Sequence, residues 1–284
     1  MKYKKQASGT NFLSLLLRVL LWCAAAVTFA TLIFLIGYVL IRGLPHLKPS
    51  LFSLKYSSEN VSMLPSIITT LETTFFSLLI AVPLGLFTAV YLVEYSRKGS
   101  RAVKLIRLTA ETLSGIPSII YGLFGMLFFV SAMGFGLSVL AGAFTLSIMI
   151  LPLIIRTTEE ALLSVPDLYR EASFGLGAGR LRTVFRVVLP SAVPGILGGV
   201  ILGIGRIVGE TAALLYTSGT VPQIPENVMS SGRTLALHMY LLSSEGLNTN
   251  EAYATAVVLL IVVLFINTVS AMAAKGLIGE RKGA

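Results

Sequence analysis

The sequence predicts an all-α membrane protein with six transmembrane helices. Of its 284 residues, 55% are apolar and only 12% are charged, and the mean hydropathy is +0.85. A soluble domain has about 25% charged residues. Long apolar segments recur along the chain, and a bilayer core requires about 20 mainly apolar residues per helix. Lipid is therefore the expected surroundings of much of the surface.

Six segments meet this length requirement. The first follows a basic start, and its apolar run is about twice the length of a signal-peptide core, which favours an uncleaved anchor over a cleaved signal. Pro117 is expected to kink the third helix, and Pro190 and Pro194 the fifth. The expected helices cover residues 12–41, 67–93, 108–130, 137–155, 184–216 and 252–274.

These helices divide the chain into three parts. Residues 1–66 hold an N-terminal cytoplasmic segment, the first helix and an outer loop. Residues 67–276 form a core domain of five helices that includes a polar loop at 157–186, and residues 277–284 form a tail.

Basic residues are distributed unequally between the two sides of this arrangement. Three precede the first helix, five lie between the second and third, four in the 157–186 loop and three near the C-terminus, whereas the opposite side carries four. Short cytoplasmic loops carry the excess of Lys and Arg. Both termini and the 157–186 loop are therefore expected in the cytoplasm.

Several classes of function are excluded by what the sequence lacks. There is one cysteine, the two histidines are far apart, and no G-x-x-x-x-G-K-[ST] motif is present. The sequence thus offers no cluster of metal ligands and no phosphate-binding loop for ATP. The net charge of +9 is spread along one membrane side without interleaved aromatic residues, which argues against nucleic acid. Any transport must draw its energy from a partner or an ion gradient.

The stretch EASFGLGAGRLRTVFRVVLP, residues 171–190, is the most polar and basic part of the second half. The preceding residues have helical character, and Leu168, Ala172 and Leu176 recur at four-residue spacing. Three glycines then allow a sharp bend. The pattern predicts a short helix across the cytoplasmic face, which suits either a groove on a partner protein or a lipid surface.

The same stretch resembles the cytoplasmic loop signature of binding-protein-dependent ABC import permeases. Ser stands at the third position where Ala is usual, and Val at a position where Ile is usual. The resemblance implies a type I ABC importer permease fold in which 157–186 is the coupling loop. Its short coupling helix would insert into a partner ATPase, which binds the ATP and Mg. The residues carrying the signature are Glu171, Ala172, Ser173, Gly177, Val187, Leu189 and Pro190.

Three further stretches, SGIPSIIYGLFG, LPLIIRTTEEAL and GIGRIVGETAALLYTSG, resemble the phosphate-specific permeases, and more the PstA than the PstC member of the pair. This implies a non-catalytic subunit of a phosphate importer in the bacterial cytoplasmic membrane. Its partners would be a PstC-like permease, two PstB-like ATPases and an external PstS-like phosphate-binding protein. Sulfate, molybdate or phosphonate would suit the same charges. An ion-gradient-driven transporter is a second possible class of protein, but it would show inverted repeats, and the sequence has no convincing repeat. A sensory or scaffold membrane protein is a third possible class.

Arg206 and Glu210 lie within the apolar part of the fifth expected helix. A mid-bilayer charge costs about 2.5–3.5 kcal/mol on insertion scales, so such residues rarely face lipid. Their four-residue spacing predicts one helix face, which small or polar residues continue. Arg206 either contacts the substrate in the translocation path or forms a structural ion pair with Glu210. The stripe comprises Gly195, Gly199, Gly203, Ala213 and Thr217.

Three more residues are candidates for the substrate pathway. Arg156 ends the fourth expected helix, where it either snorkels to the headgroups or, as the resemblance implies, serves transport. Ser118 and Tyr121 follow Pro117 and either contribute to a gate or make ordinary helix contacts. Glu72 and Glu111 lie near helix starts without an assigned role.

Overall fold

The computed structural model describes residues 12–97 and 99–279, and within these ranges the regular structure is entirely helical. Five helical segments are long and apolar enough to cross a membrane, and a sharply bent pair makes a sixth. The prediction of an all-α membrane protein with six spans is therefore confirmed. The basic residues expected near the two ends at positions 2–5 and 281–282 lie outside the described residues.

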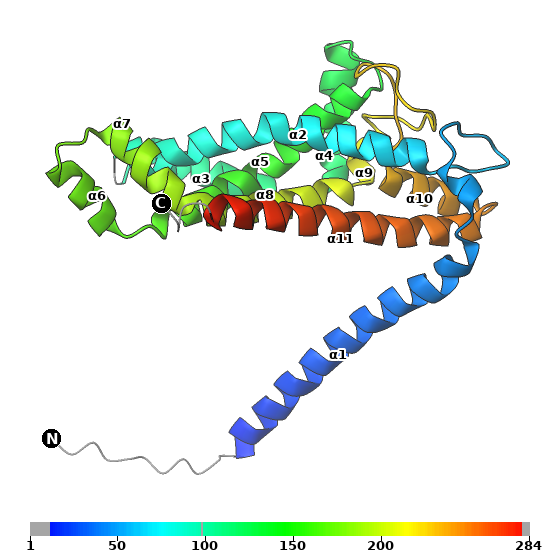
Figure 1. Cartoon of the computed structure of the whole chain (residues 1–284), viewed down its shortest axis with the longest axis horizontal. Coiled ribbons are helices and arrows are strands. Elements are labelled where there is room, and N and C mark those ends of the chain that lie inside the picture. Colours follow the sequence, from blue (N-terminus) through cyan, green and yellow to red (C-terminus); the bar gives the residue numbers. More distant parts are fainter. Residues whose placement is uncertain (1–11, 98, 280–284) are drawn as a thin grey trace.

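Four long helices form the body of the molecule (Figure 1). They are α2 (Leu64–Val90), α5 (Val139–Leu163), α8 (Leu189–Val208) and α11 (Thr249–Gly279). Helix α5 is the central one, packing on both α2 and α8. Its start is capped because the Ser138 hydroxyl accepts a hydrogen bond from the Ala141 N–H at 3.2 Å. Its fully buried side chains include Leu146, Met149, Ile150 and Ile154.

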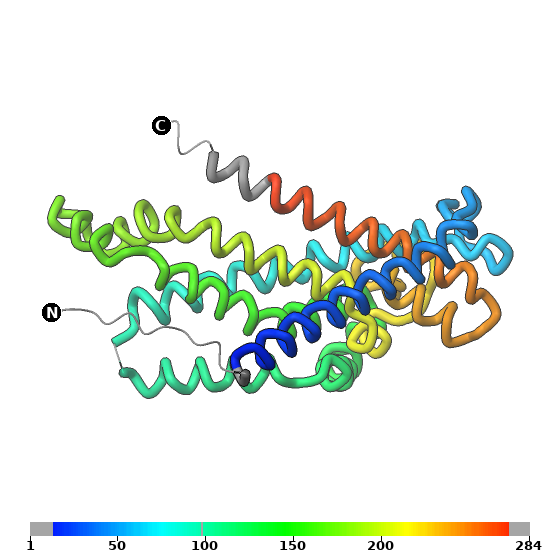
Figure 2. The backbone as a smooth tube through the Cα atoms, turned by 90° about the horizontal axis from the view of Figure 1, so that it is seen from below, coloured from blue at the N-terminus to red at the C-terminus, as the bar shows by residue number. Residues whose placement is uncertain are grey.

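Helix α1 (Phe12–Gly43) diverges from this body in Figure 1, and in the view from below in Figure 2 it passes in front of the other helices. No residue of its most apolar 18-residue window is buried within the described part of the chain. Contact with α11 occurs near the end of α1, where the rings of Tyr38 and Tyr253 meet edge to face at 5.9 Å. Gly43 lies against the Tyr253 carbonyl with no room for a side chain.

The third expected helix is two helices, α3 (Arg101–Ser114) and α4 (Ser118–Gly125), the latter continued by the π-helical η4 (Met126–Ala132). The two are bent by 101°, far more than the kink expected at Pro117. Pro117 lacks the N–H that would continue the helix. The Tyr121 hydroxyl also donates to the Leu113 carbonyl at 2.7 Å, which satisfies an acceptor at the end of α3.

The prediction of one continuous helix over residues 184–216 was wrong. The segment begins with α7 (Arg180–Thr183) and the π-helical η5 (Val184–Val188), and α8 ends at Val208. Gly209 caps α8, and α9 (Ala212–Leu215) begins after two non-helical residues. The break is stabilised because the Glu210 carboxylate accepts a hydrogen bond from the Ala213 N–H at 3.1 Å.

The connecting segments gather at the two ends of the body (Figure 1). At one end lie α6 (Asp167–Gly175), α7 and the π-helical η3 (Tyr91–Tyr95) that extends α2. The described start of α1 and end of α11 point to this end as well. The opposite end carries η1 (Leu44–His46), η2 (Pro49–Phe52) and α10 (Leu235–Glu245). This arrangement agrees with the expected grouping of the loops.

A buried polar cluster joins α10 to the loop after η2. His238 has no exposed surface and Arg233 is 6% exposed, and the Arg233 guanidinium stands 5.1 Å from the centre of the Tyr56 ring. Neither ring nitrogen of His238 has a hydrogen-bond partner within the described residues. Burial, and then the positive charge of Arg233, lower the pKa of His238 to about 3. His238 is therefore neutral in the folded protein at physiological pH.

This depressed pKa predicts a loss of stability in acid. The unfolded chain protonates His238 below about pH 6.5 while the folded protein resists it, so stability falls as the pH decreases from 6.5 toward 3. The limiting slope is about 1.4 kcal/mol per pH unit. We expect His238→Leu to flatten the decrease in melting temperature between pH 7 and pH 4 in purified protein. His46→Gln, at a partly exposed position, is the control, and equal acid sensitivity of His238→Leu and wild type would contradict the assignment.

Candidate functional site

A cavity of about 400 Å³ lies between α3, α5 and α8, and half of the residues that line it are charged. Helices α3 and α5 contribute residues at spacings of three and four, so each presents a single face to the cavity, whereas α8 contributes Arg206 alone. Three arginines and three glutamates balance in formal charge. They are Arg107 and Glu111 on α3, Arg156, Glu159 and Glu160 on α5, and Arg206 on α8.

Ion pairs neutralise two of the three arginines. Arg107 pairs with Glu159 and ties α3 to α5. Arg156 donates from Nε to Glu160 Oε1 at 3.2 Å along α5, and both side chains are 66% exposed. Arg206 is half-buried, and its guanidinium has neither an ion pair nor a hydrogen bond to another described residue. Arg206 is therefore the one guanidinium of this cavity without an ion pair among the described residues.

The ion pair between Arg206 and Glu210, the alternative to a pathway role for Arg206, does not form among the described residues. The reason is the end of α8 at Val208, after which Glu210 belongs to the turn that starts α9. Placing both residues on one helix face was therefore wrong, as was extending that face to Ala213 and Thr217. Glu210 does not line the charged cavity.

The glycine part of the predicted stripe brings α8 close to α5. A Cβ atom on Gly195 would lie 2.7 Å from Ala161 Cβ, and one on Gly199 would lie 2.6 Å from Thr157 Cβ. Real Cβ atoms do not approach so closely, so glycine is required at both positions. Arg206 follows Gly203 by three residues, on the side of α8 that faces α5.

Ser118 and Tyr121 lie outside the charged cavity. Ser118 is half-buried at the first turn of α4. Tyr121 is 5% exposed and its hydroxyl holds the end of α3, as described above. It remains near enough to Arg206 for the two groups to interact electrostatically. The structure thus places Arg156 and Arg206 in one cavity, which Ser118, Tyr121 and Glu210 do not line.

Sequence reasoning missed four residues of the cavity, namely Arg107, Glu111, Glu159 and Glu160, to which it gave no role in a site. The signal was present as a periodicity. Arg107, Glu111 and Ser114 recur at four and three residues, and Arg156 and Glu160 at four. Such a polar face at the end of an expected membrane segment indicates a surface that does not contact lipid.

The short helix predicted around residue 171 is α6, and its apolar side chains are turned to the outside. Leu168 is 68% exposed and Leu176 is 90% exposed. The helix ends at Gly175, and Gly177 has a φ of +81°, a left-handed conformation that glycine adopts without strain. Two exposed leucines on a short polar helix indicate a contact surface for another molecule.

The signature residues occupy different positions around α6. Glu171 and Ala172 are exposed, whereas Ser173 is buried and its hydroxyl shares a 2.8 Å hydrogen bond with Thr183 of α7. A cavity of about 510 Å³ separates α6 from α8, lined in part by Ala172, Ser173, Leu176 and Pro190. Leu189 is half-buried and packs into the apolar cluster formed with α2 and the end of α5.

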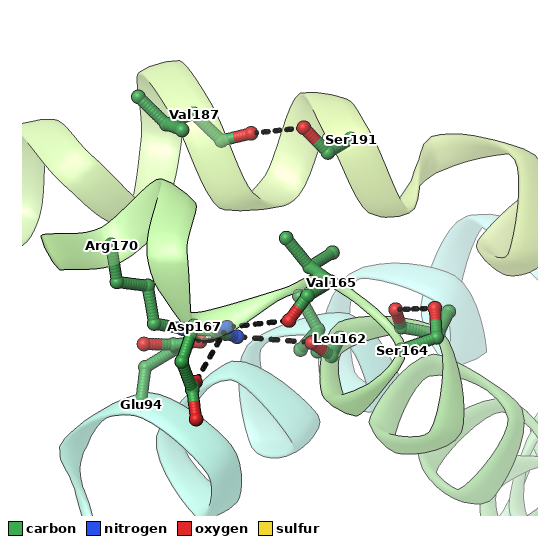
Figure 3. A network of polar contacts seen from close by, with 9 residues as sticks. Glu94, Leu162, Ser164, Val165, Asp167, Arg170, Val187 and Ser191 are labelled. Carbon is green, nitrogen blue, oxygen red and sulfur yellow. Dashed lines mark hydrogen bonds and ion pairs between the residues drawn. The ribbon is translucent and has the colours of Figure 1, made fainter. Parts of the chain in front are cut away.

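Arg170 attaches α6 to the rest of the molecule (Figure 3). It forms an ion pair with Glu94 of η3 at 2.7 Å, and the two side chains are 14% and 8% exposed. It also donates to the carbonyl oxygens of Leu162 and Val165 at the end of α5, at 3.0 and 2.8 Å. Glu94 was not among the predicted site residues, and Arg170 was considered only as a cytoplasmic charge.

A helical body of several candidate membrane spans, with a partly open cavity that holds six charged side chains and an exposed helix at one end, is the arrangement expected of a membrane permease subunit. The family described as "Binding-protein-dependent transport system inner membrane component" matches residues 81–278. The chain belongs to this family and is an ABC importer permease subunit, a class whose members are non-catalytic membrane components.

Curated relatives carry two kinds of name. The chain is 36% identical over 263 residues to the probable ABC transporter permease protein YqgI of Bacillus subtilis (strain 168), covering 86% of this chain and 89% of that protein. It is 39% identical over 196 residues to the phosphate transport system permease protein PstA 1 of Mycobacterium tuberculosis (strain CDC 1551 / Oshkosh), covering 68% of this chain and 64% of that protein. A probable PstA of Methanocaldococcus jannaschii is 34% identical over 206 residues, or 71% of this chain and 72% of that protein.

Solved ABC transporters share the fold. A chain of the MetNI methionine ABC transporter, in an inward-facing conformation, aligns with a TM-score of 0.58 and 22% identity, covering 75% of this chain and 93% of that one. A chain of a bacterial ABC transporter for the acidic polysaccharide alginate aligns with a TM-score of 0.63 and 19% identity, covering 89% and 95%. The predicted fold of ABC importer permeases is confirmed.

Proposed function

We propose that this permease subunit serves an ATP-driven importer of inorganic phosphate and forms half of its translocation pathway. The observation that carries the proposal is the free guanidinium of Arg206 in a charged cavity, within a chain whose relatives include proteins named PstA. A guanidinium matches two oxygens of a phosphate group in a bidentate contact, and partial burial strengthens it. Arg156, paired with an exposed glutamate, is the second contact on the path.

The partners of the proposed complex follow from the same reasoning. A PstC-like permease would supply the other half of the pathway, and an external PstS-like protein would deliver phosphate at the end that carries α10. Two PstB-like ATPases would bind ATP and Mg at the opposite end, one of them in contact with α6. This chain itself requires no cofactor or metal and engages no nucleic acid. Its place would be the bacterial cytoplasmic membrane, with both termini in the cytoplasm.

Transport of the purified complex tests this function. The four kinds of subunit are reconstituted in proteoliposomes, and ATP-dependent uptake of labelled phosphate is compared with uptake of labelled sulfate. Phosphate uptake that exceeds sulfate uptake supports the proposal. Transport of sulfate, molybdate or phosphonate in place of phosphate assigns the permease to another oxyanion, and gradient-driven uptake without ATP rejects the ATP-driven class.

A crosslinking experiment tests the proposed ATPase contact of α6. In a Cys23→Ser background, we expect cysteine at Leu176 to crosslink to the ATPase within the assembled complex, because that side chain is 90% exposed on α6. The matched control is cysteine at Leu247, which is 85% exposed but lies after α10 at the other end. A Leu176 variant that gives no ATPase product in an assembled complex would remove the coupling role of α6.

A further inference from the structure

One guanidinium joins three helices at the end of the molecule that carries α6 (Figure 3). Arg170 of α6 contacts Glu94 Oε1 from both Nε, at 3.0 Å, and Nη2, at 2.7 Å. Nη2 and Nη1 also reach the carbonyls of Leu162 and Val165, which belong to the last turn of α5 and the turn after it. Every nitrogen of the guanidinium is therefore engaged, with acceptors on α2, α5 and the α5–α6 turn.

Glu94 lies at the end of the buried face of α2. This face passes through Gly85, Ala89 and Val90, and Glu94 follows Val90 by four residues, so Glu94 continues the same face. Residues Tyr91–Tyr95 form a π-helix, in which backbone hydrogen bonds join residues five apart. The Glu94 carboxylate at this place meets Arg170 of α6.

The ion pair between Arg170 and Glu94 is expected to persist when α6 moves. Both members are largely buried, so separating them would leave an uncompensated charge in a poorly hydrated site, which is strongly unfavourable. The third carboxylate in the network, Asp167, meets Nη1 at 3.2 Å but is 85% exposed, so water can replace it. The durable part of the network is thus Arg170 with Glu94 and the two carbonyls.

The covalent link between α5 and α6 is only the turn Ser164–Pro166, which would permit α6 to pivot. Arg170 restricts this rotation of α6, because its side chain binds the end of α5 and the end of α2 simultaneously. Helices α2 and α5 pack along their length, so they form a stiff pair. Glu159 and Glu160, which line the charged cavity, precede Leu162 by three and two residues.

We propose that Arg170 and Glu94 are positioning residues that transmit movement of α6 to the helices lining the cavity. A force on α6 would then displace the ends of α2 and α5 as one unit, and with them the cavity glutamates and the Arg107 that Glu159 holds. This inference rests on the proposed function in one respect, namely that an ATPase acts on α6. It does not depend on which anion is carried.

The test measures transport and ATP hydrolysis together in the reconstituted complex. We expect Arg170→Gln and Glu94→Gln to lower the number of anions imported per ATP by about 10-fold, the size expected of mutations along a coupling network. ATP hydrolysis would stay within about twofold of wild type, because neither residue contacts nucleotide. Arg170→Lys keeps the charge but cannot span the carboxylate and two carbonyls, so its ratio should be intermediate.

Asp167→Asn is the matched control, since it alters the exposed carboxylate of the same network and should leave the ratio unchanged. If Arg170→Gln fails to assemble, the isosteric Glu94→Gln carries the test. An unchanged ratio in Glu94→Gln, a parallel fall of transport and hydrolysis, or an equal effect of Asp167→Asn would overturn the inference. Wild-type complex that imports sulfate instead of phosphate rejects only the proposed substrate, and the ratio is then measured with sulfate.

Discussion

Arg206→Gln is expected to abolish uptake while the permease still assembles with its partners. The guanidinium of Arg206 has no partner among the described residues, so its removal breaks no internal contact. It does remove two charge-assisted hydrogen bonds to the substrate, and each such bond is worth about 1.5–3 kcal/mol. Uptake by reconstituted complex should therefore fall at least about 100-fold, which corresponds to about 2.7 kcal/mol.

Two control variants separate this effect from a general loss of charge. Arg18→Gln removes an exposed arginine from α1, away from the cavity, and uptake should be unchanged. Arg206→Lys keeps the positive charge without the bidentate geometry, so it should retain a fraction of the activity. If Arg206→Gln transports at the wild-type rate, Arg206 is not part of the pathway.

Gly199→Leu is expected to prevent correct packing of α8 on α5. Any side chain at residue 199 would overlap Thr157, whose Cβ lies 2.6 Å from the position of the added Cβ. Overpacking of this kind costs about 1–3 kcal/mol or more, and here it also separates Arg206 from the α5 wall of the cavity. We expect less folded protein in the membrane, a lower melting temperature and no measurable uptake.

The adjacent residue provides the control for this substitution. Gly198 has open space around the position of a Cβ atom, so Gly198→Leu tests the same chemical change one position away on the same helix. It should retain assembly and transport. Equal tolerance of leucine at residues 198 and 199 would show that α8 does not approach α5 as closely as described.

Composition and apolar length were enough to predict the helical membrane fold, because burial in lipid imposes a strong and local requirement on each span. The glycine signature was also readable, since Gly175 and Gly177 end α6 where expected. These features depend on residues close together in the chain. The family resemblance then placed α6 and the charged residues in a transport setting.

The breaks in the helices were harder to predict. The sequence showed Gly209 and Glu210 within an apolar run, but the end of α8 also depends on the Glu210 carboxylate that caps α9. The right-angle bend after Ser114 likewise depends on Tyr121, which bonds back across eight residues. Propensity carries no information on such side-chain contacts, so an uninterrupted helix was the natural expectation at residues 184–216.

The cavity was only half predicted for a related reason. Arg156 and Arg206 were identified because each is a charge in an apolar segment. Arg107 and Glu159 were not identified, because their ion pair joins α3 to α5 and the two residues are 52 positions apart in the sequence. The residues of the Glu94–Arg170 pair are 76 positions apart, and no local pattern in the sequence links them.

The detached position of α1 has a consequence for biogenesis. A helix that shares almost no surface with its neighbours must partition from the translocon into lipid on its own apolarity, and α1 is apolar enough to do so. Helix α3 cannot enter lipid on its own in this way, because α5 and α8, which line the same cavity as its charged face, are synthesised later. We therefore expect α1 to insert into the membrane first, and α3 to reach its final position only after α5 and α8 have been inserted.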